Sequence, residues 1–208
     1  MRLLTAQVIV TATRSSLNDV EFLHLDGRDV QQLTEAMLEC SNLVSLSLSR
    51  NQLRAPLAPL ARCSELWHID LSYNQLVSLE GLQHFVALGS LKLAYNQIPA
   101  HELRWLQDIE LVHLTLEGNP ATVKPLEEVA RQHIDDEATP TSRHVCASYR
   151  PGVLAVVPTP WTIDGQFVVA AERVAASHIS AAVTVELDRL AAEAPASPNV
   201  NFQWSSGS

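Results

Sequence analysis

The feature that most constrains this chain is a leucine pattern that recurs four times between residues 43 and 120. Each copy fits Leu-x-x-Leu/Ile-x-Leu-x-x-Asn, and the copies begin at Leu43, Leu66, Leu88 and Leu111. A degenerate copy begins at Val20 and has Arg28 at the asparagine position. The starts are therefore 23, 23, 22 and 23 residues apart. Self-similarity at a fixed short period indicates a solenoid of stacked repeats.

The spacing of the leucines predicts the local structure of each copy. The fourth and sixth residues lie on the same side of a short strand, because side chains alternate across a strand. One copy cannot bury this face alone, so stacked copies bury it against one another and align their strands in a parallel sheet. Between the strands we expect irregular or 3₁₀ turns over 57–60, 79–85 and 103–106, and Pro56 and Pro59 argue against a regular helix in the first.

The asparagine that ends each copy stands where the chain leaves the strand. Its amide both donates and accepts hydrogen bonds, so it can satisfy backbone groups of the bend and of the next coil. We therefore assign a structural role to Asn51, Asn74, Asn96 and Asn119.

These motifs resemble the leucine-rich repeat proteins of the short, 22-residue class. The resemblance implies an α/β fold: a solenoid with short parallel strands on the concave face, irregular or 3₁₀ convex turns, an N-terminal helix and a C-terminal cap. The opening, with Leu4, Thr5, Val8, Leu17 and Val20, is similar to that of cilia-associated leucine-rich repeat proteins and of the spliceosomal A-prime subunit.

A second motif resembles the C-terminal cap of the same class. It is formed by Tyr149-Arg150-Pro151, Val153-Leu154, Pro158, Ile163-Asp164-Gly165, Val168 and Glu172-Arg173. Val153, Leu154 and Val157 are expected to cover the last repeat, Ile163 to supply a final strand residue and Asp164 to cap the following helix. Trp161 departs from the family pattern, and we expect it to be buried.

The predicted organisation has six parts. They are an N-terminal capping helix (1–19), the repeats (20–120), an inserted helix and loop (121–148), the C-terminal cap (149–175), a helix (176–194) and a disordered tail (195–208). The first helix is expected over 3–14, with Leu4 and Val8 on its buried side and Thr5 as its cap. The inserted helix is expected over about 124–133.

Charge and cysteine content exclude several classes of protein. Lys and Arg number 14 against 23 Asp and Glu, and the acidity is spread evenly, which disfavours direct binding to nucleic acid and a polybasic membrane anchor. No apolar run is long enough to span a bilayer. Three cysteines without a Cys-x-x-Cys pair do not form a disulfide framework, and we expect Cys40 and Cys63 to be half-buried on the convex side.

Motifs of catalysis and of metal binding are absent from the sequence. It contains no GxGxxG, GxxxxGK, GxSxG or HExxH, so we predict no enzyme, no catalytic residue and no cofactor. The best cluster of metal-ligating residue types fits no closed zinc site, and we interpret it as a solvated acidic loop. It consists of His133, Asp135, Asp136, Glu137, His144 and Cys146.

Outward-facing strand residues and their neighbours are the candidate binding site. We predict that a protein partner contacts Trp67, His68, Asp70, Tyr73, Lys92, Tyr95 and His113. Alternatives remain open: Tyr73 and Tyr95 could stack on each other for structure, Trp67 could pack under a flank, and the two histidines could be solvated surface.

The resemblance implies a non-catalytic scaffold or adaptor for protein–protein interaction. We expect a cytoplasmic location, in an assembly of the cytoskeleton, cilium, flagellum or basal body, with the chain a monomer within a larger complex. Two alternatives are a nuclear ribonucleoprotein subunit of the A-prime type and a phosphatase regulatory subunit. The net charge of −9 favours a partner segment with a basic or mixed face.

Overall fold

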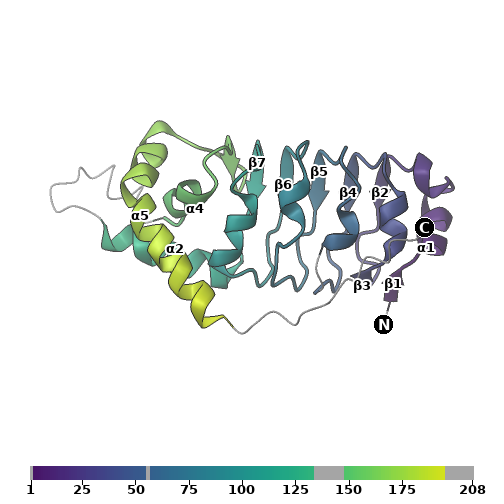
Figure 1. Ribbon diagram of the computed structural model, residues 1–208, viewed down its shortest axis with the longest axis horizontal. Coiled ribbons are helices and arrows are strands. Elements are labelled where there is room, and N and C mark those ends of the chain that lie inside the picture. Colours follow the sequence, from purple (N-terminus) through teal and green to yellow (C-terminus); the bar gives the residue numbers. More distant parts are fainter. Residues whose placement is uncertain (1, 55–56, 134–147, 195–208) are drawn as a thin grey trace, which may run out of the picture.

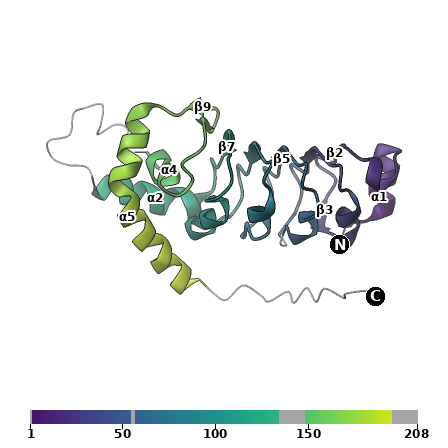
Figure 2. The same cartoon turned by 45° about the horizontal axis from the view of Figure 1, so that its top comes forward.

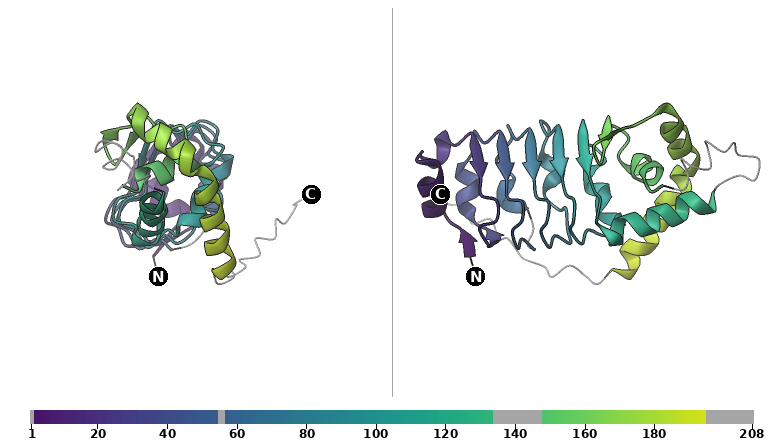
Figure 3. Two further views of the ribbon diagram at one scale, coloured as in Figure 1. Left: turned by 90° about the vertical axis from the view of Figure 1, so that its left-hand side faces the viewer. Right: turned by 180° about the vertical axis from the view of Figure 1, so that it is seen from behind.

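The computed structural model describes residues 2–54, 57–133 and 148–194, which form an elongated stack of coils closed by helices (Figure 1). Six parallel strands follow one another in a seven-stranded sheet, and a short antiparallel strand ends it. They are β2 (Phe22–His24), β4 (Ser45–Ser47), β5 (His68–Asp70), β6 (Ser90–Lys92), β7 (His113–Thr115), β8 (Thr162–Ile163) and β9 (Gln166–Phe167). The expected leucine-rich repeat solenoid is confirmed, and its strands lie side by side in Figure 3.

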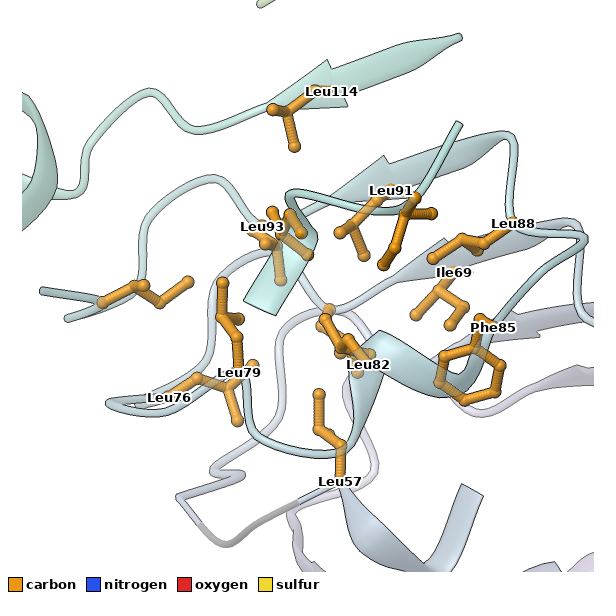
Figure 4. Packing of buried hydrophobic residues seen from close by; sticks show 14 of the residues in the cluster. Leu57, Ile69, Leu76, Leu79, Leu82, Phe85, Leu88, Leu91, Leu93 and Leu114 are labelled. Carbon is orange, nitrogen blue, oxygen red and sulfur yellow. The ribbon is translucent and has the colours of Figure 1, made fainter. Parts of the chain in front are cut away.

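The core fills the inside of the coils. The register aligns Leu23, Leu46, Ile69, Leu91 and Leu114 across neighbouring strands, and all five are fully buried. Leucines from the bends and the convex side complete each layer (Figure 4). The convex segments are 3₁₀ helices, as expected, at Glu35–Glu39, Ala58–Leu60, Leu82–His84 and Ala100–Leu106.

Two cysteines lie deeper than we expected. Cys40 and Cys63 are fully buried instead of half-buried. Their thiols face back into the stack, where Cys63 Sγ donates to the carbonyl oxygen of Met37 at 3.4 Å. Burial raises the pKa of the Cys63 thiol to about 12, so this side chain is a neutral core residue at neutral pH.

The four repeat asparagines form a ladder of buried hydrogen bonds. The amide oxygen of Asn74 accepts from Leu53 N at 3.0 Å, while its amide nitrogen donates to the carbonyls of Leu48 and Leu71 at 2.9 and 3.0 Å. Leu48 and Leu53 belong to the preceding coil, so the expectation of bonds to the next coil had the direction wrong. The same pattern recurs at Asn51, Asn96 and Asn119.

Replacing Asn74 by leucine is expected to lower the free energy of unfolding by about 1–3 kcal/mol, because buried backbone groups of two coils lose their partners. Gln97→Leu, at an exposed position in the next repeat, is the control and should change little. Urea denaturation followed by circular dichroism measures both. Equal midpoints for the two variants and the wild type would show that the ladder does not stabilise the fold.

The N-terminal end differs from the prediction. Residues 3–4 belong to strand β1 (Arg2–Leu4), which pairs in parallel with β3 (Val30–Leu33), and helix α1 (Ala6–Thr13) begins only after it. The chain start pairs with the otherwise unpaired edge of β3, so Leu4 is buried from a strand. Within α1 the buried residue is Ile9, and Thr5 makes no capping bond with its side chain.

Helices α2 (Pro120–Gln132), α4 (Arg150–Val156) and α5 (Ala170–Glu193) cover the last coil (Figures 1 and 2). Helix α2 begins at Pro120 instead of near residue 124, since proline is well suited to the first turn. Val153, Leu154 and Val157 are buried, as the cap resemblance implies. The expected loop and tail fall within 134–147 and 195–208, outside the described residues.

Two expectations for the cap are wrong. The side chain of Trp161 is 68% exposed, because this residue directly precedes strand β8 and only the strand residues that follow it turn inward. Asp164 caps no helix: its carboxylate accepts from the backbone of Leu116 and Glu117 at 2.7 and 2.9 Å. The N-terminus of α5 is capped by Glu172 instead, which accepts from the backbone N–H of Val169 at 2.9 Å. Among the described residues, no helix is long and apolar enough to cross a bilayer.

Candidate protein-binding surface

The solvent side of the seven-stranded sheet, here called the concave face, carries the predicted site residues in rows that cross the strands. The register aligns Phe22, Ser45, His68, Ser90 and His113 in one row, and His24, Ser47, Asp70, Lys92 and Thr115 in the next. These positions alternate with the buried leucines, so they lie on the side of the sheet that is turned away from the core. The sheet therefore holds side chains that are far apart in sequence at fixed neighbouring places.

The histidines of the concave face are tied to neighbouring strands. His68 Nδ1 lies 2.9 Å from Ser90 Oγ, and His113 Nδ1 lies 2.8 Å from Thr162 Oγ1. Burial and the charge of Lys92 lower the pKa of His68, against the opposing effect of Asp70. The imidazole of His68 is therefore neutral at pH 7 and serves as a positioned hydrogen-bonding group.

Asp70 and Lys92 form an ion pair at the centre of the concave face, with Nζ 3.6 Å from Oδ2. Asp70 is held in place, since it also accepts from the backbone N–H of Ser72 at 3.0 Å and its side chain is only 18% exposed. The side chain of Lys92 is 46% exposed. A partner carboxylate can therefore reach the ammonium group without disturbing the fold.

Tyr73 and Tyr95 stack on each other where the chain leaves β5 and β6. Their ring centroids are 4.5 Å apart, with 12° between the ring planes. The Arg50 guanidinium lies 5.4 Å from the Tyr73 centroid on the other side. A Cβ at Gly118, whose φ is +69°, would stand 2.4 Å from the Tyr95 ring, so the glycine leaves room for the stack. We call Arg50, Tyr73, Tyr95 and Gly118 the tyrosine stack.

The tyrosines can serve both as a structural stack and as a binding surface. The rings are stacked, yet Tyr73 and Tyr95 remain 47% and 45% exposed. The negative charge of Glu117 and the neighbouring Tyr73 raise the pKa of Tyr95, which keeps its hydroxyl a donor. The stack is thus both a structural element and a rigid surface.

Trp67 does not pack under a flank. Its indole ring lies against Gly89 of the next coil, where an added Cβ would come within 2.1–2.4 Å of three ring atoms. The side chain is nevertheless 50% exposed. The glycine seats the ring and leaves its outer side free.

Exposed aromatic side chains gather around this sheet. Six of the nine aromatic residues in the described part of the chain are at least 45% exposed, and all six lie in the strands or next to them: Phe22, Trp67, Tyr73, Tyr95, Trp161 and Phe167. Trp161 was expected to be buried, so it was not predicted as a surface residue. The signal was present, because Trp161 precedes Ile163 by two residues just as Trp67 precedes Ile69.

No protein-family model matches the chain. Among curated proteins, the human "Serine/threonine-protein kinase 11-interacting protein" is 35% identical over 122 residues, which is 56% of this chain and 11% of that protein. The mouse "Centrosomal protein of 72 kDa" is 45% identical over 58 residues, 24% of this chain and 9% of that protein. The chain thus spans about a tenth of the length of these relatives.

Among solved structures, two internalins of Listeria monocytogenes are similar to this chain. InlF has a TM-score of 0.44 and 15% identity, over 71% of this chain and 48% of the internalin. Internalin C2 has a TM-score of 0.40 and 18% identity, over 74% of this chain and 79% of the internalin. The leucine-rich repeat fold is established by the strand register and the buried leucines described above.

Proposed function

We propose that this protein is a non-catalytic interaction scaffold that binds a partner protein across its concave face. One observation carries the proposal: the exposed aromatic side chains of the described residues concentrate around a single sheet. Tyrosine and tryptophan dominate binding hot spots, because each offers a large apolar area together with a polar group. The proposed contact residues are Trp67, His68, Asp70, Tyr73, Lys92, Tyr95 and His113.

Rigidity supports this assignment. The tyrosine stack and the Asp70–Lys92 pair fix several of these side chains before any partner arrives. Binding then costs little side-chain ordering, so more of the contact energy appears as affinity. The pair also presents both charges to a partner, which favours a segment of mixed charge.

The kind of assembly in which the protein acts is a more specific part of the proposal. The human relative is named as an interacting protein, and the mouse relative is named as a centrosomal one. These names support an adaptor in a centrosomal, ciliary or other cytoplasmic assembly, in which this chain acts as a monomer. The 22- and 23-residue period and the 3₁₀ convex turns support membership of the short repeat class.

The test begins with affinity purification and mass spectrometry to identify the partner, followed by Kd measurements on the purified pair. Asp70→Arg combined with Tyr95→Ala is expected to weaken binding at least about thirtyfold, the effect of losing a hot spot. Neither residue belongs to the core, so circular dichroism and the melting temperature should stay close to those of the wild type.

The matched control places the same kinds of change on the convex side. Glu35→Arg with Val86→Ala alters an exposed acid and an apolar side chain that is 88% exposed, and it should bind the partner normally. The competing location is the insertion. If the concave variant binds like the wild type while deletion of 134–147 abolishes binding, the concave assignment is wrong.

A further inference from the structure

The residues directly before the strands form a continuous edge of the sheet. We call Glu21, Val44, Trp67, Gly89, Val112 and Trp161 the leading edge. The backbone N–H of each donates to the carbonyl of the one before it, at 2.8, 2.9, 3.0, 2.8 and 2.9 Å in order. Five hydrogen bonds of normal length therefore fix the spacing of these positions along the solenoid.

Two tryptophans on the leading edge present their rings to solvent. Trp67 is 50% exposed and is seated on Gly89, and Trp161 is 68% exposed. A ring that is already immobilised loses little freedom when a partner covers it.

Exposed carboxylates stand at or just before three of the six leading-edge positions. The five-residue segments that end at the six leading-edge positions contain five carboxylates and no lysine or arginine: Asp19, Glu21, Glu65, Asp108 and Glu110. All five acids are exposed. The guanidinium of Arg173 brings one positive charge to the last segment, where it donates to the carbonyls of Pro158 and Pro160, the latter at 2.7 Å.

We propose that the leading edge is a second docking surface, which adjoins the concave face at Trp67 and takes an extended, arginine- or lysine-bearing segment of a partner protein. The faces of Trp67 and Trp161 attract cations through the ring quadrupole, and Trp is the strongest of the aromatic residues in this respect. Glu65 and Glu110 stand two residues before Trp67 and Val112, where their carboxylates pair with the same basic side chains.

The spacing of the rings selects an extended segment over a helix. Neighbouring strands are about 4.8 Å apart, so the three steps from β5 to β8 separate Trp67 and Trp161 by about 14 Å. Residues four apart in an extended chain lie on one face and span about 13–14 Å. Same-face residues of an α-helix recur at about 10.5, 12 and 16.5 Å, from seven, eight and eleven residues, and match less well.

The peptide (Arg-Thr)₄-amide, with carboxyfluorescein on its N-terminus, is the probe; the full chain is titrated into it at about 100 mM salt, and binding is followed by anisotropy. The (Glu-Thr)₄ peptide and a helical alanine-rich peptide with four arginines are its controls. Saturable binding of the first peptide, at least about tenfold tighter than of either control, is the expected result. Equal binding of the two arginine peptides would overturn the inference of an extended ligand, and no saturable binding would overturn the site.

Variants locate the peptide. Glu65→Lys with Glu110→Lys should weaken binding at least about tenfold, and Trp161→Ala severalfold. Glu35→Lys with Glu80→Lys makes the same change of net charge on exposed convex positions and should leave Kd within about twofold. Equal losses of peptide affinity in the two double-lysine variants would show that only net charge matters, and would overturn the proposal.

Two further outcomes separate this surface from the other candidates. Tyr95→Ala, which alters the concave face, should leave the affinity for the peptide unchanged. The proposal for the leading edge and the proposed function of the concave face can therefore fail independently. The last experiment measures the oligomeric state of the wild type and of the Glu65→Lys, Glu110→Lys variant by sedimentation velocity. A wild-type dimer that becomes a monomer in the variant would make the leading edge a self-association surface and overturn the proposal.

Discussion

Replacing Glu172 by alanine is expected to lower the free energy of unfolding by about 3–5 kcal/mol, because it leaves a buried guanidinium without its partner. Arg150 Nε lies 2.5 Å from Glu172 Oε1, and the two side chains are only 11% and 9% exposed. Arg150 also donates to the carbonyls of Ile163 and Phe167, at 2.5 and 3.0 Å. The pair thereby ties helices α4 and α5 to strands β8 and β9.

Two variants give this prediction its controls. Glu186→Ala breaks an ion pair with Arg189 on the surface of α5, where the arginine side chain is 52% exposed, and should cost at most about 1 kcal/mol. Arg150→Met combined with Glu172→Leu removes both charges and should recover much of the loss. Chemical denaturation of the four proteins measures the effect, and a Glu172→Ala cost below about 1 kcal/mol would show that the pair does not hold the cap.

Truncation after Asn119 is expected to abolish soluble, cooperative folding. It removes the three helices that pack on the 3₁₀ helix Ala100–Leu106, together with the strand that pairs with β7. The apolar edge of the last repeat would then face solvent, as at any uncapped solenoid end. Truncation after Ala194 removes only residues outside the described part and should leave stability and solubility unchanged.

Size-exclusion chromatography and thermal melting of the two fragments measure the difference. Aggregation or a non-cooperative melt is expected for 1–119, and wild-type behaviour for 1–194. A monomeric 1–119 fragment with a sharp melting transition would show that residues 120–194 are not a cap.

The repeats could be predicted because each fixed residue type has one physical task. A leucine at the fourth position can only point inward if the copies stack, and an asparagine at the end of the copy has buried backbone groups to satisfy. Those constraints recur, so the register that aligns Ser45, His68, Ser90 and His113 could be read from the sequence before the structure was known.

The ends could not be predicted so well, because their residues do not repeat. Leu4 is apolar and would be buried in a helix as well as in a strand. It stands in a strand because residues 2–4 pair with the free edge of β3. Asp164 looks like a helix cap by its position before α5, yet two backbone N–H groups of the preceding strand's end bind it. Trp161 looks apolar, but its place on the leading edge exposes it.

The residues beside the sheet could be predicted from the sequence, but the way in which they pack could not. Sequence alone places Trp67 and Tyr95 beside the sheet, but it does not show that glycines of the next coil seat both rings. Gly89 stands 22 residues after Trp67, and Gly118 stands 23 residues after Tyr95, so the lack of a glycine side chain matters only once the coils are stacked.

Hydroxyl-radical footprinting of the complex with the identified partner tests the central claim most directly. Tyrosine and tryptophan side chains are oxidised readily, so the oxidation rate of each exposed ring shows whether the partner covers it. We predict that Tyr73 and Tyr95 become protected on binding, while Val86 and Val185 on other surfaces keep their free-chain rates. Unchanged oxidation of both tyrosines, with protection confined to the convex side or to residues 121–148, would contradict binding on the concave face.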